Sequence, residues 1–69
     1  MFDKNRFKAA LALRGMTLKD LAAALNLNES TVYRKINADG DFSRSEINHM
    51  IIILGIDDPK DIFFADELA

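Results

Sequence analysis

Apolar residues recur at intervals of three and four along much of the chain, the spacing that places side chains on one face of an α-helix. The clearest stripe consists of Leu18, Leu21, Ala22 and Leu25. No segment alternates apolar and polar residues for long enough to predict a β-strand. The pattern therefore predicts an all-α fold.

Local signals at the helix ends divide the chain into short helices. The starts carry side chains that cap helices, and the ends carry glycine or asparagine, which tolerate the left-handed conformation. The capping residues are Asp3, Thr17, Asn28, Ser43 and Asp58, and the terminating residues are Gly15, Asn26 and Gly55. These signals predict five helices, at about residues 4–14, 18–25, 29–37, 44–54 and 59–68.

The inward faces of these helices predict one hydrophobic core. Phe2 and Phe7 have the spacing of a hydrophobic staple around the start of the first helix. Val32 and Ile36 are the inward residues of the third helix, and Phe42 is expected to fold back onto the core after a turn. The core face of the fourth helix is expected to consist of Ile47, Met50, Ile51 and Leu54.

Length and composition narrow the class of protein. A chain of 69 residues with 49% hydrophobic residues and no cysteine predicts a single domain, residues 1–69, without disulfides or thiolate zinc sites. The one histidine, His49, does not make a metal site with carboxylates alone in any common pattern, so no metal or cofactor is expected. The longest apolar run is Met50 to Leu54, and the first residues lack the order of a secretory signal, which predicts a cytoplasmic protein.

Charge is distributed unevenly along the chain. The formal net charge is −2 and the sequence pI is about 5.1, which disfavours nucleic acid as a partner. Residues 1–45, however, contain eight basic and five acidic side chains, a net charge of +3, and residues 46–69 contain one basic and six acidic, a net charge of −5. This polarity fits a DNA-binding face in the first part of the chain, although a surplus of capping carboxylates would produce a similar distribution.

The second and third predicted helices carry the most informative pattern. Residues 17–37 read TLKDLAAALNLNESTVYRKIN. Leu21, Leu25, Leu27 and Val32 are apolar where two helices crossing at a steep angle would lock together, and Ala22 is small where they would approach most closely. A three-residue turn would then present the start of the third helix outward, where it can enter a major groove.

This segment resembles the helix-turn-helix of phage repressor and Cro proteins, the XRE type of transcriptional regulator. The flanking residues 7–16 and 41–56 are similar to that family as well, so the resemblance covers nearly the whole chain. It implies a compact five-helix, lambda repressor-like DNA-binding fold. It also implies sequence-specific binding of double-stranded DNA by a phage- or prophage-type repressor.

Three positions depart from the family pattern. The family often has glutamine at the first position of the second helix, where it touches a DNA phosphate, and this chain has Leu18. Asn26 replaces the turn glycine but keeps the left-handed option, and Lys35 precedes Ile36 at the late core position of the third helix. The first two departures affect the expected phosphate contact more than the fold.

The resemblance implies that the third helix reads base pairs through Glu29, Ser30 and Arg34. Arg34 can donate two hydrogen bonds to guanine, and Ser30 can contact a base edge or a phosphate. Tyr33 can contact a thymine methyl group or donate to a phosphate, and it can equally cover the core. Glu29 either accepts a hydrogen bond from cytosine N4 or provides favourable charge at the helix N-terminus.

Polar and basic residues around this helix are expected to contact phosphates, which give affinity without sequence information. These residues are Lys19, Asn28, Thr31, Lys35, Asn37 and Arg44. Asn28 would do so at the helix N-terminus, where free backbone N–H groups favour an anion.

The C-terminal segment has more apolar surface than a monomer is expected to cover. Five residues, Ile52, Ile53, Phe63, Phe64 and Leu68, would be left over and predict a homodimer interface. A homodimer would bind a pseudo-palindrome with half-sites about one helical turn apart. Alternatively, the last helix folds onto the fourth and buries both.

The sequence also bears on two other functional classes. The acidic pI favours a protein-interaction module or anti-repressor on the same fold, without DNA binding. An enzyme is not expected, because the sequence has no glycine-rich phosphate loop and no Ser/His/Asp set, and His49 has no evident acid or nucleophile partner.

Overall fold

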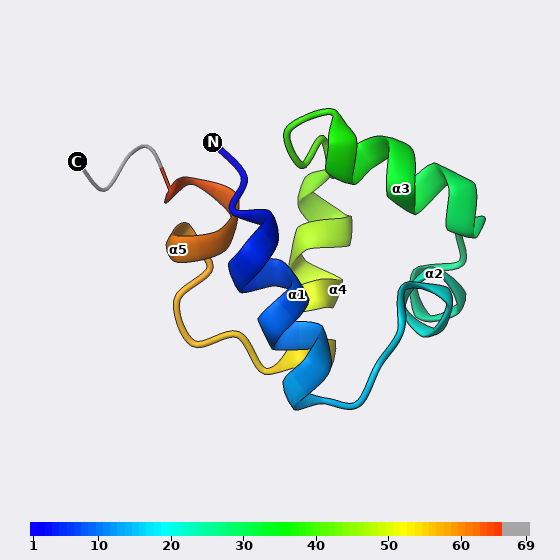
Figure 1. Cartoon of the computed structure of the whole chain (residues 1–69), viewed down its shortest axis with the longest axis horizontal. Helices are drawn as coiled ribbons and strands as arrows, with labels where there is room; N and C mark the ends of the chain where they lie inside the picture. The colour runs from blue at the N-terminus through cyan, green and yellow to red at the C-terminus, as the bar shows by residue number, and fades with distance from the viewer. Residues whose placement is uncertain (66–69) are drawn as a thin grey trace.

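The structure is a computed structural model that describes residues 1–65 (Figure 1). Five helices follow one another along this part of the chain, and no strand occurs in it. They are α1 (Lys4–Leu13), α2 (Leu18–Leu25), α3 (Glu29–Asn37), α4 (Arg44–Leu54) and α5 (Lys60–Phe63). The prediction of five helices is confirmed, but α5 ends at Phe63, and the predicted last residue, Leu68, lies outside the described residues.

The predicted caps account for the starts of α1, α2 and α4, whereas the N-cap residue of α5 is Pro59 and not the predicted Asp58. Asp3 Oδ1 accepts the Arg6 amide at 3.0 Å. Thr17 and Asp20 form a complete capping box: the Asp20 amide donates to Thr17 Oγ1 at 3.1 Å, and the Thr17 amide donates to Asp20 Oδ2 at 2.9 Å. Ser43 and Glu46 form a second capping box: the Glu46 amide donates to Ser43 Oγ at 3.2 Å, and the Ser43 amide donates to Glu46 Oε1 at 2.8 Å. These side chains satisfy amides that a helix start otherwise leaves without partners.

A cation joins the end of α1 to the end of α4. Gly55 ends α4 in the left-handed conformation, with φ of 61°. The Arg14 Nε donates to the Leu54 carbonyl oxygen at 2.9 Å, and a Cβ atom placed on Gly55 would collide with the Arg14 guanidinium. The backbone angle therefore favours glycine at this position, and a larger residue would also require the Arg14 guanidinium to move.

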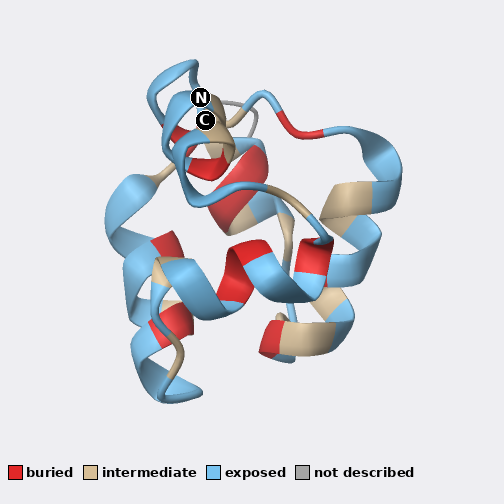
Figure 2. Ribbon diagram, turned by 90° about the vertical axis from the view of Figure 1, so that its right-hand side faces the viewer, coloured by how far each residue is buried: buried red, intermediate tan, exposed pale blue. Residues whose placement is uncertain are grey.

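The core lies where α1, α2, α3 and α4 meet, and each contributes one of the largest fully buried side chains: Phe7, Leu21, Val32 and Met50. Figure 2 shows that the buried residues gather on the inward faces of the helices. The Phe2 ring lies 5.2 Å from that of Phe7, as the hydrophobic staple predicts. Phe42 is buried beside them, which confirms that the chain folds back after α3.

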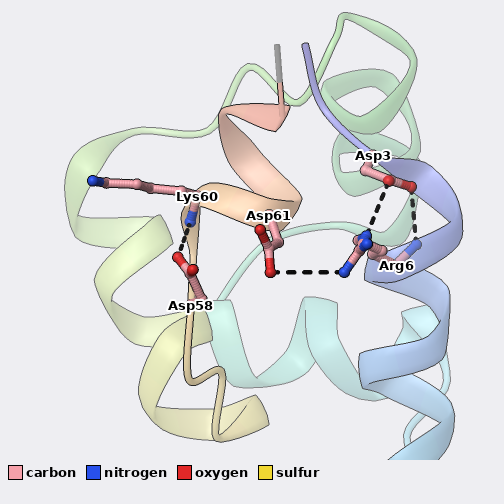
Figure 3. Close-up of polar contacts among 5 residues, drawn as sticks. All are labelled: Asp3, Arg6, Asp58, Lys60 and Asp61. Carbon is pink, nitrogen blue, oxygen red and sulfur yellow. Dashed lines mark hydrogen bonds and ion pairs between the residues drawn. The ribbon is translucent and has the colours of Figure 1, made fainter. Parts of the chain in front are cut away.

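The N-terminal segment is built into this core. The Asp3 amide donates to the Ile62 carbonyl oxygen at 2.7 Å, and the Phe2 amide donates to Asp39 Oδ1 at 2.9 Å. Figure 3 shows how Arg6 lies between Asp3 and Asp61, at 3.5 and 3.7 Å. These ion pairs are largely exposed and contribute little stability, so the backbone contacts and the aromatic rings hold α5 against α1.

The structure corrects two of the residues predicted to pair monomers. Phe63 is only 6% exposed, because its ring packs 5.7 Å from Phe2 and 6.5 Å from Phe42. Ile53 is half-buried and packs against the same core. Both side chains therefore pack against the core of their own chain. Two of the four core residues predicted for α4, Ile47 and Ile51, are only partly buried.

Candidate nucleic-acid interface

The junction of α2 and α3 has the geometry that the sequence predicts. Ala22 and Val32 are buried, with 3% and 0% exposure, so the helices meet across a small side chain. Asn26 ends α2 in the left-handed conformation, with φ of 58°, and the Leu27 amide donates to the Ala22 carbonyl oxygen at 2.8 Å. In Figure 1, α2 is seen nearly end-on while α3 lies across the view, so the two cross at a steep angle.

The third helix has one buried face and one exposed face. Val32 and Ile36 point into the core, as predicted. The residues of α3 on the exposed side are Glu29, Ser30, Tyr33, Arg34 and Asn37. All four residues expected to read bases are therefore on the surface, and they come from the same helix.

The start of α3 differs from the starts of α1, α2 and α4. Asn28 occupies the N-cap position, but its side chain makes no capping hydrogen bond. The Asn28 side chain and the first amides of α3 are therefore open to an anion, which a helix N-terminus favours. Glu29 is exposed beside them and has no ion pair within residues 1–65. This placement allows the Glu29 carboxylate either to accept a hydrogen bond from cytosine N4 or to stabilise the helix N-terminus by its charge.

The residues expected to contact phosphates fall into different environments. Lys19 and Arg44 are exposed, and Thr31 is partly buried. Asn37 is exposed at the end of α3, where its Oδ1 accepts a hydrogen bond from Lys4 Nζ at 3.2 Å. Sequence spacing does not reveal this contact, because 33 positions separate the two residues.

Lys35 does not fit the role of a phosphate ligand. Its Nζ lies 3.2 Å from Glu46 Oε1 and donates to the Asp41 carbonyl oxygen at 3.4 Å. Only 23% of its side chain is exposed. The lysine therefore ties α3 to α4, and its charge is already neutralised within the fold. The sequence shows that Lys35 is basic, but it does not reveal this tertiary contact with Glu46.

Two carboxylates on these helices have pKa values below their usual range. The Ser43 backbone amide lowers the pKa of Glu46; partial burial opposes this, and the Lys35 ammonium adds to it. The Thr17 amide and hydroxyl lower the pKa of Asp20. Both groups are ionised near neutral pH and act as capping residues, so neither has the environment of a proton donor.

The described part of the chain contains no group of three or more histidine, cysteine, aspartate or glutamate residues that could hold a metal ion. In the same residues, no helix is both long and apolar enough to cross a membrane.

A model of the Cro/C1-type HTH DNA-binding domain matches residues 6–66. The chain belongs to this family. The match covers α2 to α5 and all but the first two residues of α1, so the fold is an all-α helix-turn-helix domain and the predicted resemblance is confirmed. No curated protein and no solved structure gives a match. The family is one of DNA-binding domains, whereas the roles of individual side chains remain predictions.

Proposed function

We propose that this protein is a sequence-specific repressor of the phage or prophage type, which acts in the cytoplasm and reads the major groove of double-stranded DNA with α3. The observation that carries the proposal is the division of α3 into two faces. Val32 and Ile36 anchor the helix in the core, while Ser30 and Arg34 project from a Cro/C1-type domain. A domain seated on an operator excludes other proteins from the same base pairs, so repression is its most direct consequence.

Four side chains on α3 are proposed to face the bases. Arg34 is suited to a bidentate contact with guanine O6 and N7, and Ser30 to a base edge near the start of the helix. Tyr33 can place its ring on a thymine methyl group or its hydroxyl on a phosphate. Glu29 would accept from cytosine N4, which offsets the repulsion between a carboxylate and the phosphates.

A second set of residues is proposed to position the domain on the phosphate backbone. Lys19 and Arg44 supply exposed charge, and Asn28 supplies its side chain together with the open amides that follow it. Thr31 and Asn37 complete the set, from which Lys35 is removed by its pairing with Glu46.

We also propose that two copies bind one pseudo-palindromic operator, because one α3 offers few base contacts for strong specificity. Two of the five residues predicted for the interface are exposed in the described chain, Ile52 at 78% and Phe64 at 43%. The other residues along the same face of α4, Ser45, Asn48 and His49, are polar and exposed. Ile52 is therefore the proposed centre of the contact, with Phe64 beside the end of α5.

Selection of bound sequences from a pool of random duplexes tests the proposed function. We expect an enriched motif with guanine at a fixed position and with two half-sites about one helical turn apart. Recovery of no motif, together with no affinity for any duplex at low salt, would contradict the proposal. It would favour the alternative function, a protein-interaction module or anti-repressor on this fold.

A further inference from the structure

A small hollow of about 110 Å³ lies between α1 and α3. Four of its lining residues are exposed: Lys4 and Lys8 from α1, and Tyr33 and Asn37 from α3. Three apolar side chains lie beneath them, Phe7, Leu18 and Ile36. The opening therefore has a polar rim over an apolar floor, and its rim is shared by the recognition helix and the first helix.

The rim carries positive charge and no carboxylate. Two ammonium groups, one phenol hydroxyl and one amide surround the opening, and neither lysine has an ion pair within residues 1–65. Two other hollows on the described surface are lined by charged side chains that are mainly negative. One is lined by Asp39 and Asp41, and the second by Asp57, Asp58 and Asp61. The hollow between α1 and α3 is thus suited to an anion.

The same hollow continues the exposed face of α3. Lys4 Nζ donates to Asn37 Oδ1 at 3.2 Å, which brings the start of α1 to the last residue of α3. A helix with its side chains is about 10–12 Å across and therefore fills a major groove about 12 Å wide. When α3 lies in the groove, the residues of α1 that border this hollow beside it therefore lie next to a groove wall.

We infer that Lys4, Lys8 and the Tyr33 hydroxyl bind the phosphate backbone along the groove wall next to α1. The inference rests on the proposed binding of DNA by α3, and it adds α1 to the contact surface. It also assigns Tyr33 to a phosphate and leaves base reading to Glu29, Ser30 and Arg34. Leu18, the first residue of α2, has no hydrogen-bond donor in its side chain, so Lys8 supplies the charge at that edge of the hollow.

The test is the salt dependence of DNA affinity in the Lys4→Ala/Lys8→Ala variant. Each neutralised phosphate contributes about −0.9 to the slope of log K against log salt, so loss of both contacts reduces the slope by about 1.8. Base preference should not change, because phosphate contacts carry no sequence information. Arg6→Ala/Lys60→Ala is the matched control, since it removes two exposed cations outside this hollow.

Tyr33→Phe provides a second measurement on the same duplexes. A phosphate contact through the hydroxyl predicts a similar fold-loss of affinity for the selected operator and for an unrelated duplex. A ring contact with a thymine methyl group predicts no loss, since phenylalanine keeps the ring.

The outcomes separate this inference from the proposed function. If the wild-type protein shows no salt-dependent binding to duplex DNA, the proposed function fails, and the inference fails with it. If wild type binds but the two double variants have equal slopes, α1 is not part of the contact surface and the inference alone is overturned. A reduced slope for Lys4→Ala/Lys8→Ala, with the control close to wild type, supports it.

Discussion

Lys35 Nζ lies 3.2 Å from Glu46 Oε1, so an ion pair joins the third helix of this protein to the fourth. Glu46 is also the N3 residue of the capping box at the start of α4. One carboxylate therefore closes a helix start and holds the neighbouring helix. Because Arg34 is the next residue along α3, the pair also limits how the proposed reading face can rotate.

The first prediction concerns acid stability. The pKa of Glu46 in the folded protein is below its usual value of 4.5, chiefly because the Ser43 amide donates to the carboxylate. A carboxylate with a lowered folded pKa adds stability above its unfolded pKa and loses it as pH falls through the folded value. We expect Glu46→Gln to cost about 1 kcal/mol or less near neutral pH and nearly nothing below the folded pKa. Urea unfolding at several pH values measures this difference, with Asp57→Asn as an exposed control. A cost that does not depend on pH would contradict the prediction.

The second prediction concerns the junction of α2 and α3. Ala22 is 3% exposed between the two helices, so a leucine at this position overpacks the contact. Ala22→Leu should lower the free energy of unfolding by about 1–3 kcal/mol. Ala23→Leu is the control, because Ala23 is the next residue of the same helix and is exposed. Equal stability of the two variants in thermal or urea unfolding would show that the helices do not need a small residue here.

Local signals predicted much of the fold because each acts over a few residues. The two capping boxes and the left-handed Asn26 depend on neighbours within four positions, and the structure confirms all of them. Phe63 was assigned to an interface because only tertiary packing brings its ring to Phe2. The end of α5 also lies earlier than predicted, at Phe63. A periodic pattern shows that a residue is apolar, but not whether its cover comes from its own chain.

The same limit applies to the candidate site. The exposed face of α3 follows from the positions of Val32 and Ile36, so the proposed base readers could be named from sequence. The pairing of Lys35 with Glu46 could not, because it depends on how α3 packs against α4. The contact of Lys4 with Asn37 was missed for the same reason.

The third prediction concerns base reading by Arg34. Arg34→Ala should cost about 1–3 kcal/mol at the selected operator and relax the preference for guanine at one position. Lys19→Ala should weaken all duplexes to a similar extent, since a phosphate contact has no sequence preference. Replacing the guanine by 7-deazaguanine removes its N7 acceptor. The wild-type protein should bind the 7-deazaguanine duplex more weakly than the guanine duplex, whereas Arg34→Ala should bind the two duplexes equally. An unchanged base preference in Arg34→Ala would exclude the contact.

The fourth prediction concerns self-association. Ile52 is 78% exposed on α4, and an aspartate there would place a charge at the proposed contact. Sedimentation should show a dimer of the wild-type protein at high micromolar concentration or on DNA, and a monomer of Ile52→Asp. Asn48→Asp adds the same charge at another exposed position of the same face and should leave the dimer intact. A wild-type protein that stays monomeric both free and on DNA would remove the dimer from the proposal.

The most direct test of the central claim is the affinity of the intact chain for its selected operator, measured by fluorescence anisotropy across a range of salt concentrations. DNA binding through α3 and the surrounding cations predicts tight binding at low salt that weakens linearly in log K against log salt. It also predicts weaker binding to an unrelated duplex at every salt concentration. Undetectable affinity for both duplexes at low salt, with a folded protein, would contradict the account.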